Sequence, residues 1–182
     1  MSPRRWMLWG ILMSAPFAGT ASYVAYARVE AAEDRVAEMF GGRDGLKTLT
    51  EPDKVEAYRL RPLPQDKQGR RTPLKEFQIL SGPVTVPKES AKNVARSLLS
   101  YDSYEWDSAK GCLPIYGVRL SFARGDDRVD VLLCFQCDVL LVYRNGKITG
   151  GEDFDAIRPV LVRTVKPLFP DDEVVQGLKE RG

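Results

Sequence analysis

Three cysteines are the residues of this chain whose types and spacing could carry chemistry. Cys112 stands alone, whereas Cys134 and Cys137 form a Cys-Phe-Gln-Cys run inside an apolar stretch. The 182-residue chain contains no histidine, so it cannot build a Ser-His-Asp or Cys-His catalytic arrangement. Three thiols also lack a fourth zinc ligand unless a carboxylate such as Asp138 completes the set. We therefore predict no catalytic residue, no metal and no cofactor, and we interpret the cysteines first as a structural disulfide.

An apolar segment near the start of the chain indicates which compartment the cysteines meet. Arg4 and Arg5 precede 22 uncharged residues, 6–27, and about 20 apolar residues suffice to cross a bilayer as a helix. Tryptophans at one end and tyrosines at the other suit a retained anchor, whereas Ala25-Tyr26-Ala27 has the form of a signal-peptidase site. Both alternatives predict an extracytoplasmic domain, anchored in a bacterial-type inner membrane or periplasmic or secreted after cleavage at Ala27. Cysteines exported in this way tend to pair.

Two strands must position the cysteines. Apolar residues alternate with other residues over 116–122 and again over 129–135, and a turn-like stretch with Gly125 lies between these runs. This pattern predicts an antiparallel hairpin whose apolar sets share one face. A short loop, 123–126, then pairs Phe122 with Asp127, Leu120 with Val129, Val118 with Val131 and Tyr116 with Leu133.

The same register predicts the disulfide. Extended to the open end of the hairpin, it places Cys112 opposite Cys137, and opposed Cα atoms about 4.5 to 5.5 Å apart can be bridged. Cys134 and Cys137 would lie about 10 Å apart in a regular strand, too far for a bond. We therefore predict a Cys112–Cys137 disulfide and a possible free thiol at Cys134, although a two-residue change of register would open the bond.

A thiol-active redox protein that uses Cys134 and Cys137 is the alternative hypothesis. Redox Cys-x-x-Cys motifs place the attacking thiolate at the N-terminus of a helix. The residues that follow here, 138–143, are strand-like, and Asn145-Gly146 then indicates a tight hairpin turn. The pattern favours the structural interpretation.

The charge balance excludes one class of partner. The chain has 27 basic and 25 acidic residues. Without Arg4 and Arg5, the part after residue 27 has 25 of each, so we predict no nucleic-acid binding. One local basic cluster, interpreted as an exposed loop, comprises Arg59, Arg61, Lys67, Arg70 and Arg71.

The remaining pattern predicts an α+β fold: a small antiparallel sheet packed against two or three helices, preceded by the membrane-directed helix. We expect a signal-anchor or signal peptide over 1–27, an amphipathic helix and linker over 28–53, and one globular domain over 54–182. Further strands are expected at 54–60 and 76–80, and helices at 28–40, 87–100 and 154–168. Acidic residues before the third of these helices, and before a short last one, are interpreted as N-caps: Glu152, Asp153 and Asp155, then Asp171, Asp172 and Glu173.

The second half of the chain resembles a group of uncharacterised bacterial envelope proteins with no assigned activity. The segments that carry the resemblance are Lys110-Gly-Cys-Leu-Pro, Leu133-Cys-Phe-Gln-Cys, Phe154-Asp155 and Leu168-Phe169-Pro170. The resemblance implies a self-contained domain; it brings no activity, ligand or catalytic residue with it and leaves the function open. We therefore expect a noncatalytic, membrane-tethered envelope domain that is held by residues 6–27, is stabilised by a disulfide and binds an envelope partner.

Overall fold

The computed structural model describes residues 32–62, 77–106, 108 and 110–181. The chain divides into two compact units, 1–35 and 36–182. Residues 32–35 of the first unit are helical, and the predicted membrane-directed segment at 6–27 lies outside the described residues. Within the described part of the chain, no helix has the length and apolar character to span a bilayer.

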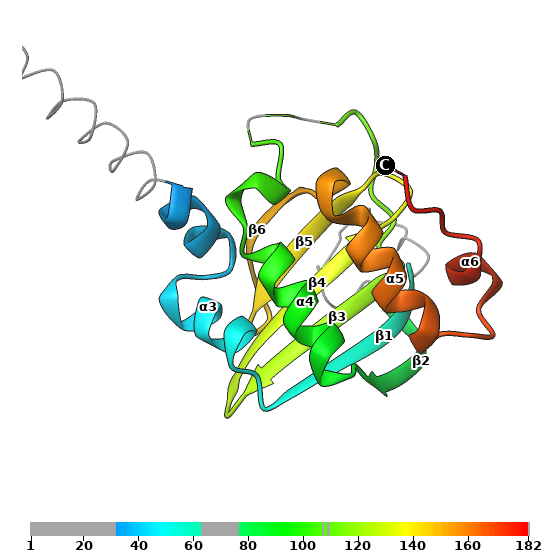
Figure 1. Cartoon of the computed structure of the whole chain (residues 1–182), viewed down its shortest axis with the longest axis horizontal. Coiled ribbons are helices and arrows are strands. Elements are labelled where there is room, and N and C mark those ends of the chain that lie inside the picture. Colours follow the sequence, from blue (N-terminus) through cyan, green and yellow to red (C-terminus); the bar gives the residue numbers. More distant parts are fainter. Residues whose placement is uncertain (1–31, 63–76, 107, 109, 182) are drawn as a thin grey trace, which may run out of the picture. The chain divides into compact units, whose positions relative to one another are not determined.

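The second unit is an α+β structure built on a six-stranded antiparallel sheet, as predicted for the fold class (Figure 1). The spatial order of the strands is β2-β1-β3-β4-β5-β6. Their bounds are β1 Lys54–Pro62, β2 Phe77–Thr85, β3 Val118–Arg124, β4 Asp127–Cys134, β5 Val139–Arg144 and β6 Lys147–Asp153. The described α-helices of this unit are α3 Arg43–Thr50, α4 Lys88–Leu98, α5 Arg158–Leu168 and α6 Glu173–Gln176, with 3-10 turns η2 Tyr101–Ser103 and η3 Asp155–Ile157.

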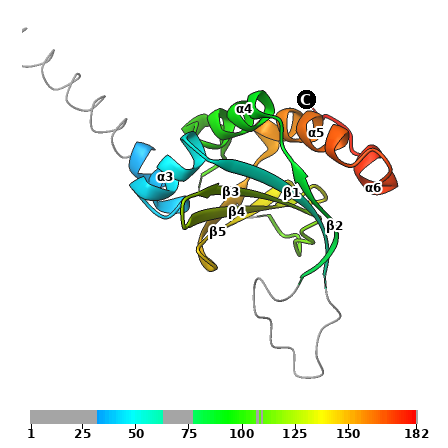
Figure 2. The same ribbon diagram turned by 90° about the horizontal axis from the view of Figure 1, so that it is seen from below.

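Helices α4 and α5 lie side by side across one face of the sheet, which Figure 2 shows edge-on. Val94 and Leu98 of α4 and Leu161 of α5 are fully buried against this face. The apolar sets of the two predicted hairpin strands point to the same face within β3 and β4, which confirms the predicted alternation there. These residues are Val118, Leu120 and Phe122 from β3 and Val129, Val131 and Leu133 from β4. Tyr116, predicted to belong to the first set, precedes β3 and packs instead against the separate cluster of Leu60, Leu132 and Tyr143.

The register of this hairpin differs from the prediction by two residues. Phe122 pairs with Val129 and Val118 pairs with Leu133, so the loop contains only Gly125 and Asp126. Gly125 has a φ of +55°, and a glycine at the first loop position suits a two-residue hairpin turn. A shift of two residues keeps every side chain on its face, which is why alternation alone could not exclude it.

The predicted linker before β1 contains helix α3. Leu49 of this helix and Phe40 before it are buried in the same core as the sheet residues. Gly41 and Gly42, with φ angles of +83° and +86°, follow the preceding helical residues, directly after the predicted helix 28–40. The core of this unit therefore includes residues that precede Lys54.

The carboxylates before α5 do not cap it, which corrects one prediction. Neither η3 nor α5 has a side-chain cap. Asp153 instead accepts a hydrogen bond from the Glu105 amide at 3.1 Å, and Asp155 pairs with Lys110. Both carboxylates therefore hold the chain that leads to Cys112. The prediction is confirmed for α6, where the Asp172 side chain accepts from the Val175 amide at 2.9 Å.

Candidate functional site

The structure joins Cys112 to Cys137 in a disulfide, the pairing expected from the sequence, with their Cα atoms 6.1 Å apart. The geometry of this pairing differs from the predicted one, because neither strand extends as far as the bonded cysteines. Strand β3 begins at Val118 and strand β4 ends at Cys134. A turn over residues 135–138 carries Cys137 toward Cys112, and Asp138 adopts a positive φ of 55° in it.

Cys134 is a buried free cysteine, fully removed from solvent. It pairs in the sheet with Val139, and its sulfur accepts the Ile115 amide at 3.2 Å. The structure therefore does not bring Cys134 and Cys137 together as a dithiol. Among the described residues there is also no group of three or more acidic or thiol side chains placed to hold a metal ion.

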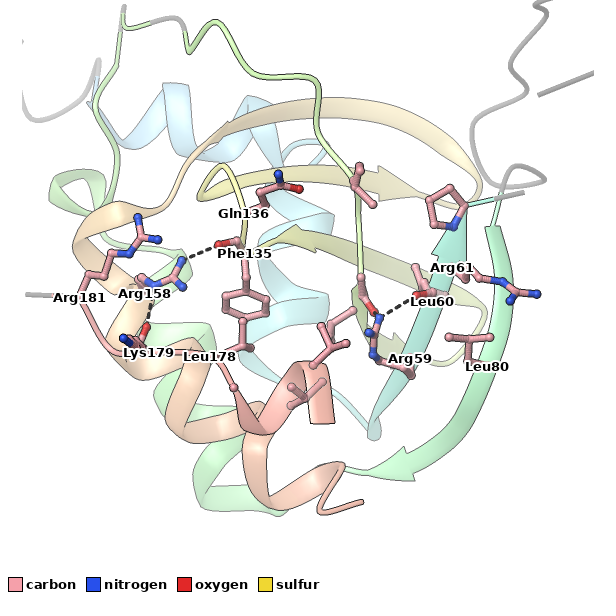
Figure 3. Close-up of a pocket in the computed structure, with 17 residues that line it drawn as sticks. Arg59, Leu60, Arg61, Leu80, Phe135, Gln136, Arg158, Leu178, Lys179 and Arg181 are labelled. Carbon is pink, nitrogen blue, oxygen red and sulfur yellow. Dashed lines mark hydrogen bonds between the residues drawn. The ribbon is translucent and has the colours of Figure 1, made fainter. Parts of the chain in front are cut away.

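The disulfide supports one wall of an open groove of about 610 Å³, a volume typical of ligand sites. Seventeen residues line this groove, which we call the cationic groove (Figure 3). They come from β1 and β2, from β3 and the chain before it, from the β4–β5 turn, from the start of α5, and from α6 and the residues after it. Ile115, Phe135 and Gln136 lie within three residues of the bonded cysteines, so the disulfide fixes the wall that they form.

Arg59 and Arg158 are the two buried cations of the groove. Arg59, 9% exposed, donates from Nε to Asp172 at 2.7 Å and from Nη1 to the Leu60 and Gly117 carbonyls. Gly117 makes room for this guanidinium, because a Cβ there would lie 3.1 Å from Nη1. Arg59 therefore joins β1 to the start of α6 and to the chain before β3.

Arg158 repeats this arrangement on the other side of the groove. It is 3% exposed and pairs with the buried carboxylate of Asp138. Nη1 also donates to the Phe135 carbonyl at 2.8 Å and Nε to the Lys179 carbonyl at 2.9 Å. Burial, together with the nearby Arg181 charge, lowers the pKa of Arg158. This single side chain ties the β4–β5 turn to the C-terminal segment (Figure 3).

We compared the whole chain with known proteins. No family model, curated protein or solved structure matches it. The resemblance to a group of uncharacterised bacterial envelope proteins thus stays a prediction.

Sequence reasoning missed the groove and misplaced two of its residues. Arg59 and Arg61 both lie in strand β1 and not in a loop, Arg59 buried and Arg61 exposed, whereas Lys67, Arg70 and Arg71 lie outside the described residues. A signal for Arg158 was present in the sequence. Arg158 lies near the N-terminal end of the helix predicted at 154–168, where a cation opposes the helix dipole and an anionic partner would offset that cost.

Acid is expected to loosen the C-terminal side of the groove through Asp172. Burial raises the pKa of this carboxyl, but the Val175 amide and Arg59 outweigh burial and hold it below its usual value. A lowered folded-state pKa means that the carboxylate stabilises the fold above its unfolded pKa of about 3.9 and loses this contribution as pH falls through the folded value. Asp172→Asn should therefore cost about 1 kcal/mol at pH 7 and progressively less below pH 4.

Urea unfolding at pH 7, 4 and 3 measures this difference. Asparagine keeps the capping oxygen, so the experiment isolates the charge. The exposed neighbour variant Asp171→Asn serves as the control and should match the wild type at every pH. A cost of Asp172→Asn that stayed constant down to pH 3 would show that the carboxylate charge does not matter.

Proposed function

We propose that this chain is a noncatalytic binding domain of the bacterial cell envelope, tethered through residues 6–27, and that the cationic groove is its binding site. The observation that supports the proposal most is the division of roles within the groove. Arg59 and Arg158 each hold distant segments together from buried positions. Exposed apolar side chains and the exposed cations Arg61, Lys179 and Arg181 line the same space. Of these three cations, only Arg61 makes a side-chain hydrogen bond within the described part of the chain, to the Gln78 amide oxygen on the neighbouring strand. A binding site needs side chains that are free to contact a ligand on a wall that is held rigid by other contacts.

The chemistry of the lining favours binding over catalysis. Its seventeen described residues include arginine, lysine, glutamine, glycine, proline and apolar side chains, and no carboxylate, thiol or hydroxyl group. General acid–base and nucleophilic steps use groups that titrate near neutrality or an activated nucleophile. Guanidinium and ammonium groups act instead as fixed charges and hydrogen-bond donors.

Site-specific photo-crosslinking in cells that produce the full chain tests this proposal. A photoreactive amino acid at Val174, which is 66% exposed in the groove, should capture an envelope component. The matched control is Ile148, an apolar residue of β6 that is 50% exposed and lies outside the groove lining. Mass spectrometry of the adduct identifies the captured molecule, whatever its class.

The expected result has two parts. The Val174 adduct should form, and it should be lost when the exposed groove cations are removed in the variant Arg61→Gln/Lys179→Gln/Arg181→Gln. Equal capture at Val174 and Ile148, or capture that survives the triple change, would contradict a role for the groove. Recovery of the full-length protein in the cytosol would contradict the envelope location.

A further inference from the structure

The charge and the apolar side chains of the groove limit the chemical classes of ligand that it could bind. Resting on the proposed function, we propose that the cationic groove binds a single-chain lipid anion: one acyl chain that ends in a carboxylate or phosphate head group. The inference rests on the charge of the lining, on the apolar side chains exposed in it, and on the hydrogen-bonding groups that are already occupied.

The lining carries a surplus of positive charge. Its cations are Arg59, Arg61, Arg158, Lys179 and Arg181. Asp172 and Asp138 neutralise the two buried arginines from behind, whereas Arg61, Lys179 and Arg181 make no ion pair with any described carboxylate. Three exposed positive charges are therefore available to an anionic head group, and arginine forks suit both carboxylate and phosphate.

A second hollow in the described part of the molecule carries a smaller surplus of positive charge. It has a similar volume, about 560 Å³, and is bounded by the end of α3 and the starts of β1 and α4. Its lining mixes acidic and basic side chains: Glu51, Asp53, Lys54, Lys88 and Lys92. Such a mixture gives a weaker preference for an anion, so the cationic groove is the better candidate.

Apolar side chains reach the surface between the groove cations. Leu80 of β2, Ile115 before β3 and Val174 of α6 are 47%, 50% and 66% exposed, and all three line the groove. Large apolar side chains that are exposed together beside charges mark a surface that a ligand covers. An acyl chain would remove these three residues from water while its head group met the cations.

The backbone of the groove favours a lipid over a peptide. The carbonyls of Leu60, Gly117, Phe135 and Lys179 all accept hydrogen bonds from Arg59 or Arg158. A bound peptide has its own amide N–H groups and needs acceptors for them once water is excluded. An acyl chain has no such donors. It therefore loses no hydrogen bond when it packs against a wall on which these four carbonyls already accept from arginine.

A photoreactive lipid probe tests the inference on the full chain, reconstituted in nanodiscs of neutral phosphatidylcholine. The probe is a 12-carbon carboxylate with a diazirine at the chain end, and peptide mapping locates the labelled residues. We expect label on the groove walls. The variant Arg61→Gln/Lys179→Gln/Arg181→Gln should reduce it about tenfold, because it removes three exposed charge contacts. The control Arg43→Gln/Arg96→Gln/Lys147→Gln removes three exposed charges outside the lining and should label like the wild type.

Two further probes separate head group from chain. The 12-carbon alcohol with the same diazirine should label at least about tenfold less, since it lacks the charge, and the matching alkyl phosphate tells which anion the groove prefers. Label on residues 6–27 is expected from the bilayer itself and is not counted. Equal labelling by the alcohol, or label spread over residues 36–181 outside the groove, would overturn the inference. If the lipid probes fail while Val174 captures a protein in cells, the proposed function stands and the ligand class is wrong. Failure of both experiments would reject both proposals.

Discussion

Replacing Arg158 with methionine should lower the free energy of unfolding by about 3 to 5 kcal/mol, the usual cost of breaking a buried ion pair. The change leaves the Asp138 carboxylate buried without its cation. It also leaves the carbonyls of Phe135 and Lys179 without their donors. Because a domain of this size is stable by only about 5 to 15 kcal/mol, this single substitution should be among the most damaging in the chain. Urea unfolding followed by circular dichroism measures the loss.

Arg163 offers the matched control for this experiment. It belongs to the same helix and also forms an ion pair, with Glu180, but its side chain is 59% exposed. Exposed pairs contribute about 0 to 1 kcal/mol, so Arg163→Met should be nearly neutral. A double-mutant cycle tests whether the two side chains act as a pair. The double variant Arg158→Met/Asp138→Asn should lose less free energy of unfolding than the sum of the two single variants, since it leaves no unpaired buried charge. Additive costs would show that Arg158 and Asp138 do not act as a pair.

The sequence was informative about faces and uninformative about register, for a reason that the β3–β4 hairpin illustrates. Burial constrains which side chains share a face, and alternation with a period of two reveals that directly. Pairing Phe122 with Asp127 or with Val129 satisfies the same constraint. The choice is made by the turn, where Gly125 permits a loop of only two residues.

The disulfide shows how a correct pairing can follow from an incorrect route. The predicted register requires both strands to continue regularly to Cys112 and Cys137. In the structure the chain turns directly after Cys134. Asp138 has a positive φ in this turn, a backbone conformation that is rare for residues other than glycine. This turn compensates for the two-residue change of register. An aspartate directly after a Cys-x-x-Cys run was the available signal for it, but a weak one.

The groove could not be predicted because its lining is scattered along the chain. Arg59, Phe135 and Arg158 come from a strand, a turn and a helix, and they meet only through tertiary packing. Sequence patterns report periodicity within one element, so they identified the strand and the helix without revealing that two of their arginines face a common space. Arg59 was also counted in a polar cluster on composition alone, although its position, two residues after Ala57 and four after Val55, places it on the buried side of β1.

Removing the disulfide should lower the free energy of unfolding by about 3.5 kcal/mol, from the loop-closure entropy of a bond that spans 25 residues. The loop encloses strands β3 and β4, the centre of the sheet, so the cross-link restricts the unfolded chain where the most non-local structure must form. The variant Cys112→Ala/Cys137→Ala should fold with unchanged secondary structure and a lower urea midpoint. The wild type treated with reductant should match it.

Cys134→Ala is the control for this change, because it alters a cysteine without altering the cross-link. It removes one small buried side chain and should cost about 1 kcal/mol, and it should keep the response of the wild type to reductant. Peptide mapping of nonreduced protein decides the pairing directly. A bond between Cys134 and Cys137 would need Cys134 to leave its pairing with Val139 and its contact with the Ile115 amide. Finding that bond would favour the redox hypothesis over the structural one. Cys134, which is a free thiol in the structure, would then form a Cys-x-x-Cys disulfide that can be reduced and re-formed.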